Sequence, residues 1–345
     1  MIDPALDTLM LPFATGDLAW PETGHILFLR ARMGASLLAA PRDRLICRQG
    51  FLPFAQALSA GKFLVDRGAA TPAGPFPMIL CLPPRQRDEA RFILADAVAH
   101  AAAGGVVVAA VGNKDGARSV EADLAALAGS VTSLSKNKCR VFWARIDRSG
   151  IDQALLADWL ALGEPRRIGD ARFLSRPGLF AWDRIDAGSA LLAQNLPVDL
   201  AGHGADLGCG FGYLSAEILA RCPKVTALDL YEAEHDALLL AEQNLAPLAG
   251  KVKLDFLWHD VTTGLTRVYD FIVSNPPFHV LKADRADLGQ GFIMAGAKAM
   301  KPGGRLLLVA NQHLPYEATL GALFARHSVL AVADGYKIIE AWKAS

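Results

Sequence analysis

The sequence has 345 residues, of which 52% are hydrophobic and 20% are charged, and its 35 basic side chains balance 35 acidic ones. The length favours two domains, the apolar content excludes a disordered chain, and the zero net charge excludes a strongly basic nucleic-acid-binding protein, although not a local basic patch. No apolar run approaches the ~20 residues that span a bilayer and no basic leader opens the chain, so we expect a cytoplasmic protein without membrane contact.

The first half alternates short apolar runs with Ala-rich helical patterns, which is typical of α/β architecture. Strands are expected at residues 26–29, 78–82, 106–111 and 141–146, with helices at 88–103 and 119–128 between them. We interpret residues 1–150 as one domain. Residues 151–177 are rich in glycine, proline and arginine, and they are expected to form a linker.

The second half, residues 178–345, shows a clearer version of the same rhythm. Strands are expected at 225–230, 252–256, 271–274 and 306–309, and two final strands at 328–332 and 336–341 flank Asp334-Gly335. Asp-Gly between two strand-like runs indicates a hairpin. We therefore predict a mainly parallel sheet closed by an antiparallel hairpin. The run at 201–205 is a poor strand by residue propensity, although a motif follows it.

That motif is a glycine-rich turn before a helix-like run at 213–221. It reads Asp206-Leu-Gly208-Cys-Gly210-Phe-Gly212. Alternate glycines let the backbone turn tightly at a strand end and approach a ligand closely. The pattern is GxGxG, whereas the dinucleotide fingerprint is GxGxxG. The Asp206 carboxylate would repel a pyrophosphate, but it suits a cationic ligand such as S-adenosylmethionine.

Two further acids follow later strand candidates. Asp229 comes 23 residues after Asp206, at the expected end of the next strand, where a carboxylate can accept hydrogen bonds from both ribose hydroxyls. Asp260 follows the third strand candidate, where it is expected to bind an adenine amino group. The five cysteines are scattered and contain no CxxC pair, so reduced thiols are expected and no metal site.

A second motif, Ser-Asn275-Pro276-Pro-Phe278-His, follows the fourth strand candidate. The two prolines fix the backbone and remove two N–H donors, which leaves a rigid loop with free carbonyl acceptors. The Asn275 side chain and the Pro276 carbonyl could accept both N–H groups of an exocyclic amine, and Phe278 could stack on the flat ring. The motif therefore predicts methyl transfer to nitrogen, which needs alignment more than a strong base.

Together these residues resemble the class I S-adenosylmethionine-dependent methyltransferases that methylate amines. The resemblance is closest to the RsmC/RlmG-type ribosomal RNA guanine-N2 methyltransferases. It is carried by residues 178–192 (GLFAWDRIDAGSALL), 206–215 (DLGCGFGYLS), 274–279 (SNPPFH) and 310–316 (ANQHLPY). It is strong over about 175–345 and looser over about 25–148.

The resemblance implies two Rossmann-like methyltransferase domains, each with a mainly parallel seven-stranded sheet and helices on both faces. The N-terminal copy would be degenerate and would serve RNA recognition or structural support. The resemblance also implies that Asp186, Gly188 and Ser189 line the methionine end of the cofactor. Its substrate would be ribosomal RNA, as the assembled small subunit, and the enzyme a monomer.

Other readings stay open from the sequence. Adenine-N6, protein-glutamine and large-subunit guanine methyltransferases share Asn-Pro-Pro-aromatic loops, and a non-catalytic RNA-binding assembly factor could retain the fold. The intact motifs of the second half favour an enzyme, and Phe278 followed by a histidine favours guanine.

Overall fold

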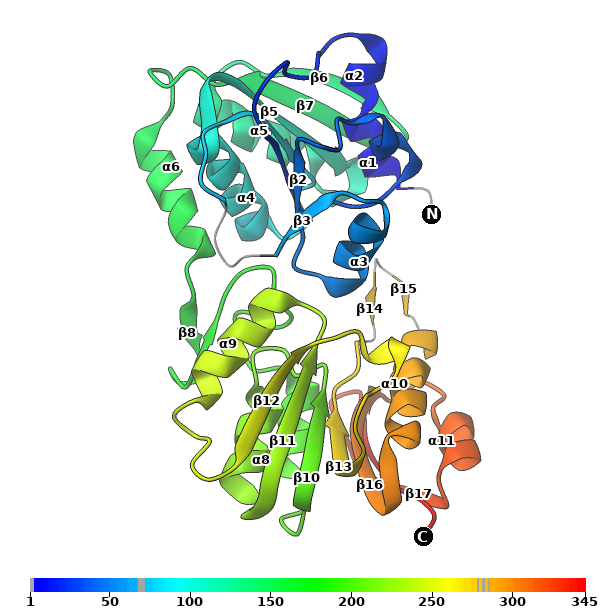
Figure 1. The fold of residues 1–345 in the computed structure, drawn as a ribbon. Helices are drawn as coiled ribbons and strands as arrows, with labels where there is room; N and C mark the ends of the chain where they lie inside the picture. Colours follow the sequence, from blue (N-terminus) through cyan, green and yellow to red (C-terminus); the bar gives the residue numbers. More distant parts are fainter. Residues whose placement is uncertain (1–2, 68–71, 278, 281–282, 285) are drawn as a thin grey trace. The chain divides into compact units, whose positions relative to one another are not determined.

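The computed structural model describes residues 3–67, 72–277, 279–280, 283–284 and 286–345. The chain forms two compact units, each built around a seven-stranded sheet (Figure 1). The first unit comprises Met1–Pro165 with Arg176–Gly178, and the second comprises Arg166–Ser175 with Leu179–Ser345.

The first sheet has five parallel strands followed by an antiparallel pair. Its strands, in spatial order, are β3 (Leu64–Asp66), β2 (Leu45–Arg48), β1 (Ile26–Leu29), β4 (Phe76–Cys81), β5 (Ala101–Gly112), β7 (Cys139–Arg145) and β6 (Thr132–Lys136).

The second sheet repeats this arrangement. Its strands, in spatial order, are β12 (Lys253–Trp258), β11 (Lys224–Glu232), β10 (Ala201–Leu207), β13 (Tyr269–Ser274), β16 (Met300–Asn311), β18 (Tyr336–Trp342) and β17 (Arg326–Ala333). When the strands of each sheet are ranked along the chain, both orders read 3-2-1-4-5-7-6. The first unit is therefore a second copy of the same fold, as the rhythm of the sequence and the family resemblance both indicated.

The first copy is degenerate at the two positions that carry the motifs. Its first strand, β1, is followed by Arg30, which keeps a left-handed φ of 54° where the second unit has Gly208 at 74°. Its fourth strand, β4, is followed by Leu82-Pro-Pro, so the diproline survives while a fully buried leucine stands in place of Asn275. The first copy therefore lacks both the glycine turn and the amide.

Helices cover both faces of each sheet. Those of the first unit are α1 (Pro4–Leu9), α2 (Leu11–Thr15), η1 (Ala35–Ala39), α3 (Leu52–Ala60), α4 (Arg87–His100), η2 (Asn113–Asp115), α5 (Ala117–Ala128), α6 (Gln153–Leu160) and η3 (Ala161–Gly163). Those of the second are α7 (Ala187–Gln194), α8 (Tyr213–Arg221), α9 (His235–Leu245), η4 (Val261–Thr263), α10 (Ala286–Lys298) and α11 (Glu317–Leu323).

Strand alternation divides each unit into two cores. In β1, Leu27 and Leu29 pack with α4, α5 and α6, whereas Ile26 and Phe28 face α1 and α3. In the second unit, α7, α8 and α9 cover one face of the sheet, and α10 and α11 cover the other. Because both faces are buried, the central strands read as continuous apolar runs, which is how the sequence revealed them.

All ten strands expected from apolar runs are present, and Asp334 and Gly335 both have the positive φ of a tight hairpin turn. The interval 151–177, expected as a linker, is largely ordered structure. Helix α6 buries Leu156 and Trp159 in the core of the first unit. Strands β8 (Arg166–Ile168) and β9 (Phe173–Ser175) form a hairpin of the second unit, because Asn244 bonds both the N–H and the carbonyl of Leu174 at 2.7 and 2.9 Å.

Packing explains why strand β10 contains a residue with poor strand propensity, Gly204. A Cβ added to Gly204 would lie 2.0 Å from the ring of Phe271 on the neighbouring strand, so that ring occupies the space of a side chain. We expect Gly204→Ala to lower the free energy of unfolding by about 3 kcal/mol through overpacking.

Thermal melting of the full chain measures this loss. Gly321→Ala in α11 is the matched control, because a Cβ at this position would have His327 as its nearest neighbour, at 3.8 Å. The control should be neutral or stabilising by about 0.5 kcal/mol. Equal melting temperatures for the two variants would contradict the packing argument.

Candidate active site

The motifs meet at one edge of the second sheet, where four parallel strands end. Leu207 at the end of β10 pairs with Tyr231 on one side and with Ser274, at the end of β13, on the other. Glu232 at the end of β11 pairs with Trp258 at the end of β12. The segments that follow these strands therefore lie side by side, where open α/β sheets bind ligands.

The glycine turn has the conformation that its sequence requires. Gly208, Gly210 and Gly212 have φ values of 74°, 54° and 92°, which side chains other than glycine rarely adopt. The N–H groups of Gly208 and Cys209 donate to the Tyr231 carbonyl at 2.8 and 3.1 Å, which fixes the turn on β11. A Cβ on Gly208 would lie 3.9 Å from the Asn275 carbonyl oxygen, so the two motifs are neighbours.

Asp206 lies under the turn and is fully buried. One carboxylate oxygen accepts the Ser215 hydroxyl at 2.7 Å, whereas the other, Oδ1, has no hydrogen-bond partner within the described part of the chain. Burial raises the pKa of Asp206 to about 7, and the nearby Glu232 carboxylate acts in the same direction. An unsatisfied buried oxygen fits a site whose missing partner is a donor on a ligand.

This raised pKa predicts a pH-dependent stability. Between about pH 4 and 7 the native Asp206 holds its proton after the unfolded chain has lost it, so each unit of rising pH costs up to about 1.4 kcal/mol. Asp206→Asn should remove this cost. The melting temperature of the variant should therefore rise relative to that of the wild type as the pH rises from 5 to 8. A difference in melting temperature that does not change with pH would contradict the raised pKa.

Asn275 is held by residues from the start of α7. Its Nδ2 donates to Ser189 Oγ at 2.7 Å and to Asp186 Oδ2 at 3.0 Å, and the same Asp186 oxygen caps α7 by accepting the Ser189 N–H. A carboxylate only accepts, so the nitrogen must face Asp186 and Oδ1 must point away. Pro276 is buried beside it, and Phe278 lies outside the described residues.

Gly188 belongs to the same group. A Cβ on it would lie 2.9 Å from the Tyr336 ring, so glycine allows α7 to approach β18. The structure thus places Asp186 and Ser189 against the Asn275 amide. Their expected place at the methionine end of the cofactor stays a prediction.

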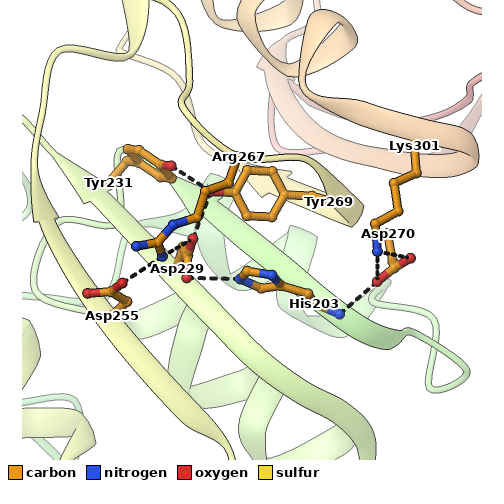
Figure 2. A network of polar contacts seen from close by, with 8 residues as sticks. All are labelled: His203, Asp229, Tyr231, Asp255, Arg267, Tyr269, Asp270 and Lys301. Atoms are coloured by element: carbon orange, nitrogen blue, oxygen red, sulfur yellow. Dashed lines mark hydrogen bonds and ion pairs between the residues drawn. The ribbon is translucent and has the colours of Figure 1, made fainter.

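Asp229 does not lie at a strand end, which corrects the sequence expectation. Strand β11 continues to Glu232, and Asp229 is buried in mid-strand. It accepts hydrogen bonds from His203 Nε2 at 2.9 Å, Arg267 at 2.8 Å and the Tyr269 hydroxyl at 2.8 Å (Figure 2). Burial acts to raise the pKa of Asp229, but these three bonds outweigh it and the pKa lies below its ordinary value.

Glu232 occupies the strand end instead. It is half-buried, and its two oxygens accept the N–H groups of Gly210 at 2.8 Å and Glu234 at 2.9 Å. Burial raises the pKa of its carboxyl despite these bonds. Each oxygen keeps a second acceptor position beside the glycine turn, so Glu232 has the placement that sequence reasoning assigned to Asp229.

Asp260 lies at the same edge. The neighbouring His259 N–H donates to the Glu232 carbonyl at 2.9 Å, which joins the two segments. One Asp260 oxygen accepts both the N–H and the hydroxyl of Thr262, at 2.9 and 2.7 Å, and so caps η4. Its carboxylate is half-buried, and its role toward an adenine stays a prediction.

The described residues show no sign of a metal site or a membrane span. No group of three or more His, Cys, Asp or Glu side chains among these residues could hold a metal ion. No helix in the described ranges is long and apolar enough to cross a membrane. The five cysteines are all buried and form no disulfide.

Comparison with known proteins agrees with this geometry. Residues 170–340 match the family model of the methyltransferase small domain. The chain is 32% identical over 256 residues to ribosomal RNA small subunit methyltransferase C of Pasteurella multocida, covering 74% of this chain and 76% of that protein. The homologous protein of Serratia proteamaculans is 30% identical over 258 residues, covering 75% and 72%.

A solved structure shows the same two-unit fold. The T. thermophilus 16S rRNA N2 G1207 methyltransferase, in complex with AdoMet and guanosine, matches 99% of this chain and 92% of its own with a TM-score of 0.79 and 24% identity. With two intact motifs at one sheet edge, a degenerate second copy and these relatives, the chain belongs to the ribosomal RNA small subunit methyltransferase C family.

Proposed function

We propose that this protein transfers a methyl group from S-adenosylmethionine to the exocyclic N2 of a guanine in ribosomal RNA. The observation that carries the proposal is the pairing of β10 with β13, which sets the glycine turn beside the Asn275-Pro276 loop. The names of the relatives point to the small subunit, and the T. thermophilus neighbour has both AdoMet and guanosine bound. We infer a cytoplasmic monomer that acts on assembled small subunits.

The residues at the strand ends fit this cofactor. Asp206 offers a buried oxygen without a partner, which suits the cationic methionine end, and Glu232 offers two acceptor positions for the ribose hydroxyls. Asp260, which follows the next strand and caps η4, is proposed to bind the adenine. When bound, the cofactor supplies an electrophilic methyl group on a sulfonium.

The Asn275 loop then orients the nucleophile. Because Nδ2 is committed to Ser189 and Asp186, Oδ1 is available to accept one N–H of the guanine amine, and the Pro276 carbonyl can accept the other. Two acceptors on the N–H groups draw electron density toward nitrogen and fix its direction of attack. Neither acceptor is a base, so alignment supplies the rate and the displaced proton passes to water.

The degenerate first unit is proposed to support RNA recognition or the structure of the catalytic unit. It has the fold without the cofactor motifs, so its sheet edge has no counterpart of the Asp206 carboxylate or of the Asn275 amide.

The test uses labelled S-adenosylmethionine and small ribosomal subunits that lack the methyl group, followed by digestion to nucleosides. Label in N2-methylguanosine is expected, and the Asn275→Ala protein is the negative control. Label in adenosine or in protein would replace the proposal by another amino methyltransferase. Absence of saturable S-adenosylmethionine binding in calorimetry would indicate a non-catalytic assembly factor.

A further inference from the structure

A polar cavity of about 490 Å³ lies in the first unit, and none of the residues that line it belongs to the motifs that the proposed function uses. It is formed where β5 ends and where the β6–β7 hairpin turns, and Gly112 and Cys139 pair at that end of the sheet. The polar side chains that line it belong to Asn113, Arg118, Ser119, Ser135 and Arg140.

The cavity walls are fixed by hydrogen bonds. The Asn113 N–H donates to the Lys138 carbonyl at 2.9 Å, which ties the loop after β5 to the hairpin turn. The Asn137 amide of the turn donates to the Thr8 hydroxyl oxygen of α1 at 3.4 Å, which holds the turn from the other side. Arg140 is held by Ser133 at 3.0 Å and by Glu121 of α5. The shape therefore exists before any ligand arrives.

The charge around the cavity favours an anion. The lining itself holds no carboxylate, and of the acids nearby Glu121 is paired with Arg140 and Asp3 with Arg32. A third acid, Asp115, points toward Gly112. Arg118 lines the cavity, and Lys114, Lys136 and Lys138 lie on the loops beside it. These four basic side chains are exposed, and none pairs with a carboxylate among the described residues.

The donors present suit a phosphate. Arg118 supplies a guanidinium and Ser119 and Ser135 supply hydroxyls, all of which are common contacts to nucleic-acid phosphates. Helix α5 begins here after Gly116, whose φ is 95° and which provides no side-chain cap, and its first residues, Ala117 to Ser119, line the cavity. No aromatic ring lines the cavity, so it offers no surface on which a base could stack.

We propose that this cavity binds a phosphodiester group of the RNA substrate at a position outside the target nucleotide. The inference rests on the proposed function only in taking RNA as the substrate. It gives the degenerate copy a specific task, which is to contact the RNA backbone without reading its sequence.

The test is the binding of unmethylated small ribosomal subunits by Arg118→Glu between 50 and 200 mM salt. We expect the Kd to rise at least about tenfold and the slope of log Kd against log salt to fall by about one. KM for subunits should rise with kcat unchanged. Arg145→Glu is the matched control, because Arg145 is exposed on the same β5–β7 ladder but pairs with Val106 at its opposite end.

Wild-type Kd and salt slope in Arg118→Glu would overturn the inference. So would saturable binding of ATP or inorganic phosphate that Arg118→Glu abolishes, because the cavity would then hold a free phosphate compound. S-adenosylmethionine affinity, measured by calorimetry, should be equal in all three proteins. If Arg118→Glu weakens RNA binding but the wild type methylates no guanine, the proposed function fails while the phosphate site stands. If the wild type methylates guanine but Arg118→Glu binds RNA as the wild type does, the proposed function stands and the phosphate site fails.

Discussion

Asn275→Ala is expected to lower kcat by a factor of about 10² to 10³ while S-adenosylmethionine affinity stays within about twofold of the wild type. The side chain is positioned before the substrate binds, because Ser189 and Asp186 fix its amide at 2.7 and 3.0 Å. Its loss removes an acceptor from the reacting nitrogen. The expected cofactor ligands Asp206 and Glu232 lie on other strands and keep their contacts.

Two further variants separate positioning from direct contact. Ser189→Ala removes one bond to the Asn275 amide but leaves Oδ1 in place, so kcat should fall by about tenfold only. Asn275→Asp keeps the shape but sets a carboxylate against Asp186, and it should be as inactive as Asn275→Ala. Quenched-flow single-turnover assays at saturating cofactor measure these rates. An Asn275→Ala protein that loses cofactor affinity but keeps kcat would contradict the assignment.

The fold was predictable because both sheets bury their central strands on two faces. Such strands are continuous apolar runs, which were visible in the sequence. The edge strands β12 and β17 were also expected, although most of their residues are half-buried or exposed. Strands β2, β3 and β6 were not predicted. Strands β2 and β3 have only four and three residues, and β6, at the edge of its sheet, is mostly polar. Strand β10 was recognisable only from the motif after it. Its residue 204 must be glycine because the Phe271 ring occupies the space of a side chain, and glycine is a poor strand former.

The site was predictable where residue type alone determines the conformation. Three glycines at positive φ and a diproline corner need no tertiary information. The end of β11 did need tertiary information, because the strand was expected to stop at residue 230 and its actual end is two residues later. For that reason Glu232 is proposed for the ribose in place of Asp229. One available signal in the sequence was that a leucine stands on each side of Asp229, so Asp229 belongs inside the apolar run rather than at its end. The structure buries both leucines fully.

Glu232→Ala is expected to weaken S-adenosylmethionine binding by about 30- to 100-fold, whereas Asp229→Ala should act mainly on stability. Glu232 lies at the strand end and presents an acceptor position on each oxygen beside Gly210. Asp229 has no comparable freedom, because His203, Arg267 and Tyr269 occupy its carboxylate (Figure 2).

Removing Asp229 leaves donors without an acceptor inside the sheet. Tyr269 is fully buried and would keep only its contact with the Tyr231 hydroxyl, while Arg267 would retain Asp255 at 2.6 Å. Because Arg267 is 42% exposed, its share of the loss is screened by water. We expect Asp229→Ala to lower the free energy of unfolding by about 2 to 3 kcal/mol, mostly through the buried hydroxyl and the imidazole.

Calorimetry with S-adenosylmethionine and thermal melting on the same preparations separate the two roles. Glu232→Gln is the conservative partner, since its amide oxygen still accepts one backbone N–H while the charge is lost, and it should bind the cofactor more tightly than Glu232→Ala. Asp229→Asn should melt early yet bind within about threefold of the wild type where it is folded. If Asp229→Asn lost the cofactor at a temperature where it is fully folded, and Glu232→Ala did not, the strand-end argument would fail and the ribose would have to lie over mid-strand β11.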